Sequence, residues 1–315
     1  MVSIKEVAKH AGVAISTVSK VLNGYPNVSE ETKKKVQDAI KELNYIPNSI
    51  AAALSSKQFG RIALVLDPNR QTQAIDQIFM QYLVGALDKA KELNVEVVTI
   101  FPYTTLFRSG MTAEEITRSF LSQSISGVVI YGMSKEDKVL QKLIREKQFA
   151  CVVVDAPIVN SRTTSISIDQ EQAQYDVAKK TVLDDNCKRV LYIAGRRDGY
   201  VTDQRLKGMK RLVKDLDLTM MVRQGDFSEL TARNVALKYA KNKDVVVCAS
   251  DLMAIGAMNA LIDMDIFRPV CGFDGITLMG YVGKQMNTIR QDFYSISSRA
   301  VEEVHQLMNG GEGHQ

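Results

Sequence analysis

The sequence contains little of what a metal site or a disulfide framework needs: three histidines and four cysteines among 315 residues. No two cysteines stand in CxxC spacing, which argues against structural zinc. Cys151, Cys248 and Cys271 lie in or beside apolar runs, a setting typical of buried free thiols in a reducing compartment. We therefore expect neither a metal nor a cofactor.

Sequence signals for catalysis, export and membrane insertion are also missing. There is no GxSxG, P-loop or HExxH motif and no GxGxxG after a strand, which makes an enzyme the weaker alternative. Residues 1–20 lack the long apolar core of a signal peptide, and no apolar stretch is long enough to span a membrane. We expect a cytoplasmic protein that does not associate with membranes.

The net charge of +4 is distributed unevenly along the chain. Residues 1–60 hold eight lysines and five acidic residues, a balance of +3, whereas the remainder holds 32 basic and 31 acidic residues, a balance of +1. A basic segment on a nearly neutral body is typical of a small nucleic-acid-binding domain. A solvated lysine face is the alternative that charge alone leaves open.

The first 45 residues predict three short helices. Ser3 and Glu6 have the spacing of a capping box, and the helix that they begin should end at Gly12. A second helix is expected over residues 15–22, and Ser29 should cap a third. The close spacing of the first two helices predicts a helix-turn-helix.

The second of these helices would be the one that meets DNA. Apolar residues can form the seam between the first two helices: Val7, Ala8, Val18 and Val21. Five residues of the second helix then face outward: Ile15, Ser16, Thr17, Ser19 and Lys20. Short polar side chains and a lysine there suit base edges and phosphates in a major groove. A three-helix cap without a DNA role is the alternative.

From Arg61 onward, apolar strand-like runs alternate with amphipathic helices. The runs are Ile62–Leu66, Val95–Phe101, Gly127–Tyr131, Cys151–Val154, Val190–Ala194, Leu218–Val222 and Val245–Ala249. Such alternation predicts parallel sheets covered by helices on both faces, and about 250 residues suffice for two lobes.

In folds of this class, ligands bind beyond the carboxyl ends of the strands. Polar residues expected near those ends are Asp155, Arg205, Ser250, Asp251 and Asp274. Carboxylates and an arginine fork recognise paired hydroxyl groups, and Phe227 or Phe79 offers a flat face for a sugar ring. Ser250 and Asp251 have a simpler alternative, which is to cap the helix that follows. Phe227 could equally be an ordinary packing residue.

A set of motifs resembles the lac/galactose repressor (LacI/GalR) family in order and spacing. The N-terminal motifs are Ile4-Lys5-Glu6-Val7-Ala8, Ala11-Gly12-Val13, Thr17-Val18-Ser19, Val21-Leu22-Asn23, Val28-Ser29-Glu30-Glu31-Thr32, Tyr45-Ile46-Pro47-Asn48 and Ala51-x-x-Leu54. Those of the body include Arg205-x-x-Gly208, Gly225-Asp226-Phe227-Ser228, Asp251-Leu252-Met253-Ala254, Gly272-Phe273-Asp274 and Ile289-Arg290-Gln291.

The resemblance implies an all-α helix-turn-helix head and a hinge, joined to a two-lobed, periplasmic-binding-protein-like α/β body. The expected domains are 1–46 for the head, 47–59 for the hinge and 60–315 for the body. Within the body, one lobe would span about 60–160 plus 290–315 and the other about 161–289. The implied function is that of a ligand-controlled transcription regulator, most simply a repressor.

The resemblance also implies particular contacts. Asn23, Asn48, Ala51 and Leu54 would contact DNA, with Leu54 as a minor-groove wedge; packing of Leu54 against the body is the alternative. Arg205 and Asp274 stand at the family's sugar-binding positions and are the first candidates for effector contacts. Gln291 and Asp155 are the next candidates. The implied partners are pseudo-palindromic double-stranded operator DNA, a second copy of the chain, and a sugar or sugar phosphate.

Two other functions stay open at this point. A regulator of the same family could take a phosphorylated partner protein as its co-effector. A sugar-binding transport receptor would suit the body, although the expected head and the missing signal peptide argue against it.

The sequence departs from the family pattern at several places. Ala14 stands where a serine cap is usual, Lys20 where arginine is commoner, and Ser250 where asparagine is common. The segment 101–110 lacks the expected polar character, and 265–271 is short, which leaves little strand before Asp274.

Overall fold

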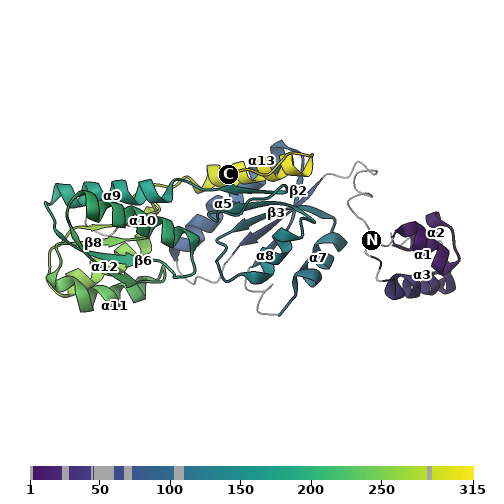
Figure 1. Cartoon of the computed structure of the whole chain (residues 1–315), viewed down its shortest axis with the longest axis horizontal. Coiled ribbons are helices and arrows are strands. Elements are labelled where there is room, and N and C mark those ends of the chain that lie inside the picture. The colour runs from purple at the N-terminus through teal and green to yellow at the C-terminus, as the bar shows by residue number, and fades with distance from the viewer. Residues whose placement is uncertain are drawn as a thin grey trace.

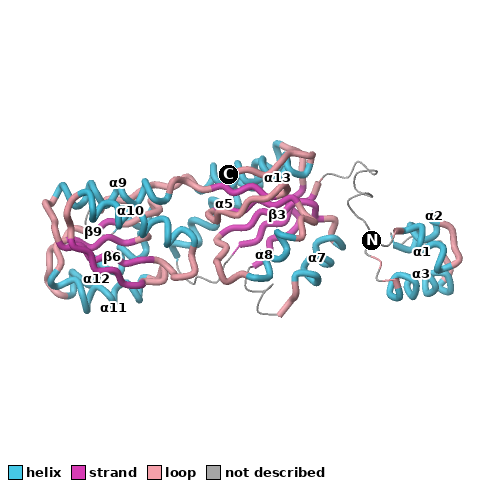
Figure 2. Tube along the Cα trace, viewed as in Figure 1, coloured by secondary structure: helices cyan, strands magenta, loops and turns pink. Residues whose placement is uncertain are grey.

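The computed structural model describes residues 3–22, 28–43, 45, 60–66, 73–102, 110–281 and 286–315. The chain forms a three-helix unit followed by two α/β lobes (Figure 1). In Figure 2, the strands lie within the two lobes, and the described part of the N-terminal unit is helical. Among the described residues, no helix combines the length and apolar character required to cross a bilayer.

The N-terminal unit consists of α1 (Ile4–Ala11), α2 (Ile15–Leu22) and α3 (Glu30–Glu42). The capping box is confirmed, because Ser3 Oγ accepts from the Glu6 amide and the Glu6 carboxylate accepts from the Ser3 amide at 2.7 Å. Gly12 ends α1 with a φ of 66°, a left-handed conformation that glycine adopts without strain. Ser29 caps α3 by accepting from the Thr32 amide. These local signals explain why the predicted helices form where they do.

The first lobe contains a five-stranded, all-parallel sheet with the order β2-β1-β3-β4-β5. Its strands are β1 (Arg61–Leu66), β2 (Glu96–Pro102), β3 (Ile125–Tyr131), β4 (Ala150–Val154) and β5 (Thr163–Ile166). Its helices are α5 (Gln73–Glu92), α7 (Ala113–Ser122), α8 (Lys138–Arg145) and α13 (Phe293–Met308).

Alternate residues of β1 show how this sheet is covered on both faces. Ala63 and Val65 pack with α7 and α8, whereas Ile62, Leu64 and Leu66 pack with α5 and α13. Since side chains alternate between the faces of a strand, a continuous apolar run is what a doubly covered strand needs.

The second lobe contains a four-stranded parallel sheet with the order β7-β6-β8-β9. Its strands are β6 (Arg189–Ala194), β7 (Thr219–Gln224), β8 (Val245–Cys248) and β9 (Val270–Cys271). Its helices are α9 (Gln170–Asp184), α10 (Tyr200–Asp215), α11 (Glu229–Tyr239) and α12 (Asp251–Asp263), followed by the 3₁₀ helix η2 (Thr277–Tyr281). Figure 1 shows α9 and α10 on one side of the sheet and α11 and α12 on the other.

The predicted two-lobed architecture with parallel sheets is confirmed, and the structure refines its boundaries. Strand β5 belongs to the first sheet, so the first lobe extends to about residue 166 instead of about 160. The chain returns from the second lobe just before α13, which packs on the first sheet. The short segment before Asp274 is indeed reduced to a two-residue strand, β9. The predicted hinge, 47–59, and residues 103–109 lie outside the described residues.

Candidate functional site

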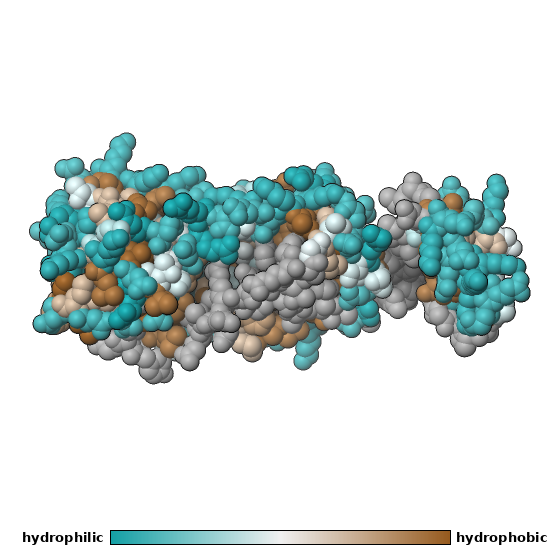
Figure 3. Space-filling view, turned by 90° about the horizontal axis from the view of Figure 1, so that it is seen from below, coloured by the Kyte–Doolittle hydropathy of each residue, from teal (hydrophilic) through white to brown (hydrophobic). Residues whose placement is uncertain are grey.

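The first candidate site is the exposed face of α2. Val7 of α1, Val18 of α2 and Val36 of α3 are fully buried and hold the three helices together. With Val18 turned inward, Ile15, Ser16 and Lys20 are exposed and Thr17 and Ser19 are partly exposed. Figure 3 shows that the described surface of this unit is mostly hydrophilic. These five residues therefore share the outward face expected of a DNA-reading helix.

Ala14 precedes α2, at the position where a serine cap was expected. The backbone carbonyl of Ala14 accepts from the amides of Thr17 and Val18, and the methyl side chain of Ala14 supplies no further acceptor. The other predicted DNA contacts lie outside the described residues: Asn23, Asn48, Ala51 and Leu54.

The second candidate site is a cavity of about 170 Å³ between the lobes. Its walls come largely from segments that follow strands, as expected for parallel sheets. The lining residues are Ile78, Gly132, Met133, Ser134, Asp155, Arg196, Asp198, Gly199, Tyr200, Val201, Arg205, Phe227, Asp274, Gln291 and Phe293. The structure thus brings together Asp155, Arg205, Phe227, Asp274 and Gln291, five of the eight residues expected to bind an effector.

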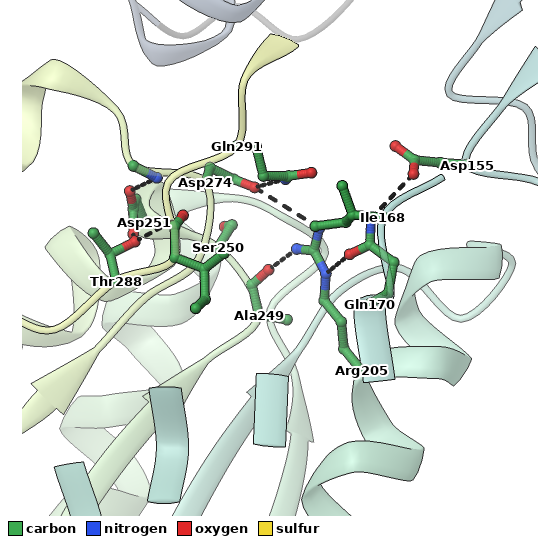
Figure 4. Close-up of polar contacts among 12 residues, drawn as sticks. Asp155, Ile168, Gln170, Arg205, Ala249, Ser250, Asp251, Asp274, Thr288 and Gln291 are labelled. Carbon is green, nitrogen blue, oxygen red and sulfur yellow. Dashed lines mark hydrogen bonds and ion pairs between the residues drawn. The ribbon is translucent and has the colours of Figure 1, made fainter. Parts of the chain in front are cut away.

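Arg205 is the central cation of this cavity and is 4% exposed. Its Nη1 donates to the backbone carbonyl of Ala249, and its Cζ lies 3.7 Å from the ring centroid of Phe273. Its Nη2 lies 3.8 Å from Oδ1 of Asp274. A dashed line marks this ion pair in Figure 4. The guanidinium is therefore oriented by the fold, with one edge turned toward the cavity carboxylate.

Asp274 follows β9 and is surrounded by groups that have opposite effects on the pKa of its carboxyl. Burial raises the pKa of its carboxyl to about 7; the Arg205 guanidinium works against this rise, and the Asp251 carboxylate adds to it. Gln291 Nε2 donates to Asp274 Oδ1 at 2.9 Å. Asp274 therefore changes charge near neutral pH, which is unusual for an aspartate.

Asp155 forms the opposite wall, directly after β4. Its φ of 62° is left-handed, a conformation that is strained for most residues but tolerated by aspartate. Its Oδ1 accepts from Ser167 Oγ at 2.8 Å and from Gln170 Nε2 at 3.0 Å. Burial also raises the pKa of Asp155, against these hydrogen bonds and Arg205. In Figure 4, the second carboxylate oxygen of Asp155 is turned away from Gln170.

Gln291 and Phe227 complete the predicted part of the cavity. The Oε1 atom of Gln291 is buried without a hydrogen-bond partner, which is costly unless a ligand or water supplies a donor. Phe227 lines the cavity beside Gly195, where a β-carbon would be 2.1 Å from its ring.

Three predicted effector residues do not line the cavity. Ser250 caps α12 by accepting from the Met253 amide, as its simpler alternative predicted. Asp251 is fully buried, and its carboxylate accepts from the amides of Gly275 and Ile276 and from a threonine hydroxyl. Phe79 packs against the core of the first lobe, and its neighbour Ile78 faces the cavity instead. The contacts of these three residues within the fold account for their positions away from the cavity wall.

Other lining residues were missed. Ser134 follows β3, and Arg196, Asp198 and Tyr200 follow β6. Their positions after the carboxyl ends of strands are the signal that could have identified them. Arg196 donates to Asp198 from Nε at 3.1 Å and from Nη2 at 2.5 Å. The two side chains therefore form a bidentate ion pair at the cavity wall.

Comparison with known proteins agrees with this architecture. Residues 3–48 match the family described as "Bacterial regulatory proteins, lacI family". The HTH-type transcriptional regulator RegA of Clostridium saccharobutylicum is 30% identical over 324 residues, covering 98% of this chain and 93% of RegA. The similarity therefore spans both the three-helix unit and the two lobes.

Solved structures of other regulators are similar to this chain in fold. The transcriptional regulator CelR in complex with cellobiose is 22% identical, with a TM-score of 0.72 and coverage of 100% of this chain and 96% of CelR. The lac repressor dimer bound to operator and an anti-inducer is 24% identical, with a TM-score of 0.67 and coverage of 100% and 95%.

Proposed function

Because the chain belongs to the lacI family of bacterial regulatory proteins, we propose that it is a repressor whose operator binding is controlled by a small sugar-like effector in the interlobe cavity. Family membership makes it a DNA-binding transcription regulator and not an enzyme. What we propose is that it represses transcription, that its effector is sugar-like, and that the residues named below perform each role. As a regulator of chromosomal genes, it would act in the cytoplasm.

The DNA contacts would come from the exposed face of α2. Ser16, Thr17 and Ser19 would reach base edges or phosphates, and Lys20 would offer a single charge to guanine acceptors. The exposure of Ile15 and Lys20 supports this assignment, since neither has a role in the three-helix core. One head covers too few base pairs for useful specificity, so two copies would read a pseudo-palindromic site.

The observation that carries the effector proposal is the acceptor-rich character of the cavity. Gln291 contributes a buried oxygen without a partner, and Asp155 and Asp274 contribute carboxylates. Arg205 is the cation that faces them, and Phe227 provides an aromatic face. Several acceptors around one guanidinium beside an aromatic ring suit the hydroxyl groups and the flat face of a sugar. CelR was solved with cellobiose, which supports a sugar here as well.

The switch would pass through residues 47–59, the proposed hinge between a head at 1–46 and a body at 60–315. A helix of about ten residues is marginal in water, so it would form only when two copies meet on DNA. Effector binding that changes the relation of the lobes would then favour or oppose hinge pairing. The effector can shift this equilibrium only by its difference in affinity for the two states.

A thermal-shift screen of the full chain against sugars and sugar phosphates tests the effector proposal, because a cavity ligand raises the melting temperature by mass action. A sugar that stabilises the protein should also change its operator affinity, and Asp274→Ala should abolish that response. A normal response in Asp274→Ala would reject the cavity assignment.

A regulator that takes a phosphorylated partner protein as co-effector is the second candidate. It would respond to charge reversals on the outer surface of the body and not to changes in the cavity.

A further inference from the structure

Gln170, the first residue of α9, touches two cavity residues that belong to different lobes. Its Nε2 donates to Oδ1 of Asp155 at 3.0 Å, and its Oε1 accepts from Nε of Arg205 at 2.9 Å. Asp155 follows β4 of the first lobe, whereas Arg205 lies on α10 of the second (Figure 4). A single amide therefore bridges the two walls of the cavity.

The orientation of the Gln170 side-chain amide is fixed by its two partners. The Nε of Arg205 is only a donor, so the oxygen of the Gln170 amide must face it and the nitrogen must face Asp155. Gln170 is 1% exposed, which means that water cannot easily replace either contact. Loss of one contact would leave a buried polar group unpaired, an outcome that folded proteins avoid.

The bridge also decides which part of Arg205 is available to a ligand. With Nε directed at Gln170 and Nη1 directed at the carbonyl of Ala249, Nη2 is the group that faces Asp274. The orientation of the guanidinium therefore depends on Gln170, and through Gln170 on the position of Asp155 in the other lobe.

We propose that Gln170 is a positioning residue that couples the effector cavity to the relative placement of the two lobes. The inference rests on the proposed function, because it describes how effector binding in the same cavity would change the relative placement of the lobes. A ligand that contacts Asp155 and Arg205 engages the two residues that Gln170 already joins. Its binding then alters this bridge, and with it the placement of the first lobe, which follows the reading head in sequence.

A distance measurement without any ligand tests this coupling. Nitroxide labels at Arg118→Cys in the first lobe and Lys241→Cys in the second would report the interlobe distance by electron–electron resonance. Both positions are exposed, and all four native cysteines are buried. In Gln170→Met, which keeps the length of the side chain but removes both contacts, we expect a shift of several ångströms or a clear broadening.

Gln174→Met is the matched control. Gln174 lies on the same helix, is fully buried, and has no hydrogen-bond partner for either side-chain polar atom. This variant should keep the wild-type distance distribution. An unchanged distribution in Gln170→Met, or an equal change in both variants, would overturn the proposal.

A polarity exchange separates the bridge from simple packing. Gln170→Glu keeps an acceptor for Arg205 but sets a carboxylate against Asp155, so we expect the lobes to separate. Addition of Asp155→Asn supplies a donor to the introduced carboxylate and should restore the wild-type distance. Failure of this rescue in a folded double variant would contradict the proposed role. A sugar screen that finds no ligand would reject the effector proposal and leave these distance results unaffected.

Discussion

The ring of Phe227 lies directly against Gly195, where a β-carbon would be 2.1 Å from the Cζ atom of that ring. Gly195 immediately follows β6, and Phe227 adopts a left-handed φ of 56° at the cavity wall. The absence of a side chain at residue 195 is therefore what allows the aromatic face to line the cavity.

The first prediction concerns Gly195→Ala. The added methyl group should push the Phe227 ring out of place and weaken binding of a stabilising sugar by about tenfold, which corresponds to roughly 1.4 kcal/mol. Titration calorimetry with the sugar from the thermal-shift screen measures this loss. Gly280→Ala is the control, because a β-carbon there meets nothing within 4 Å. Equal affinities in both variants would remove Phe227 from the binding site.

The second prediction concerns Lys20, an exposed residue of α2. Lys20→Ala should weaken operator binding by about 1–3 kcal/mol and relax the base preference at one position of each half-site. Lys41→Ala removes the same charge from an exposed position on α3 and serves as the control. Titrations with operator and with random DNA distinguish the roles, because an equal loss on both would mark Lys20 as a phosphate contact.

The local parts of the structure could be predicted from the sequence because their signals are local. Ser3, Gly12 and Ser29 determine helix ends through their immediate neighbours, and each does so in the structure. The apolar strands were equally visible because both faces of the sheets are covered. Strand β5 (Thr163–Ile166) was missed since it is short, contains three hydroxyl residues and lies at the sheet edge.

The cavity was predictable only in part. Asp155 and Asp274 follow strands, so their position was visible in the sequence. The choice between Ile78 and Phe79 depends on the rotation of α5 against the sheet, which the sequence pattern did not fix. Gln170 gave no signal, because its role arises from two residues that are brought to it by different lobes.

The third prediction concerns the pH dependence of stability. The pKa of Asp274 is about 7 in the folded state, compared with about 3.9 for an unfolded aspartate. Between these values the folded state binds more protons, so this residue lowers the free energy of unfolding as pH rises from about 4 to about 7. Asp274→Asn cannot titrate and should therefore gain stability relative to the wild type toward high pH.

Melting temperatures at pH 5 and pH 8 test this sign. The difference between Asp274→Asn and the wild type should be larger at pH 8 by at least about 3 °C, since about 1 kcal/mol corresponds to about 2–4 °C in a body of this size. Contributions from carboxyls that do not interact with Asp274 cancel in the difference. Asp217→Asn, the same substitution at an exposed position, is the control. A pH-independent difference for Asp274→Asn would mean that Asp274 is ionised throughout this range.

The last prediction concerns the surface that joins two copies. Helix α5 exposes three large apolar residues at intervals of four and three positions, which places them on one stripe: Met80 is 53% exposed, Val84 41% and Leu87 45%. We expect this stripe to be the interaction surface, with a two-fold axis that sets it against its own copy.

Val84→Asp would bury two carboxylates against each other in such a contact and should convert the dimer to a monomer. Operator affinity should then fall by at least about 100-fold, because the second head no longer binds as part of the same particle. Sedimentation velocity measures the oligomeric state, and footprinting shows whether both half-sites remain protected. Leu183→Asp is the control, since it alters an apolar residue that is 55% exposed on α9 of the other lobe. If Val84→Asp stays dimeric and protects both half-sites as well as Leu183→Asp does, the α5 stripe does not join the copies, and the two heads must be held together by another surface.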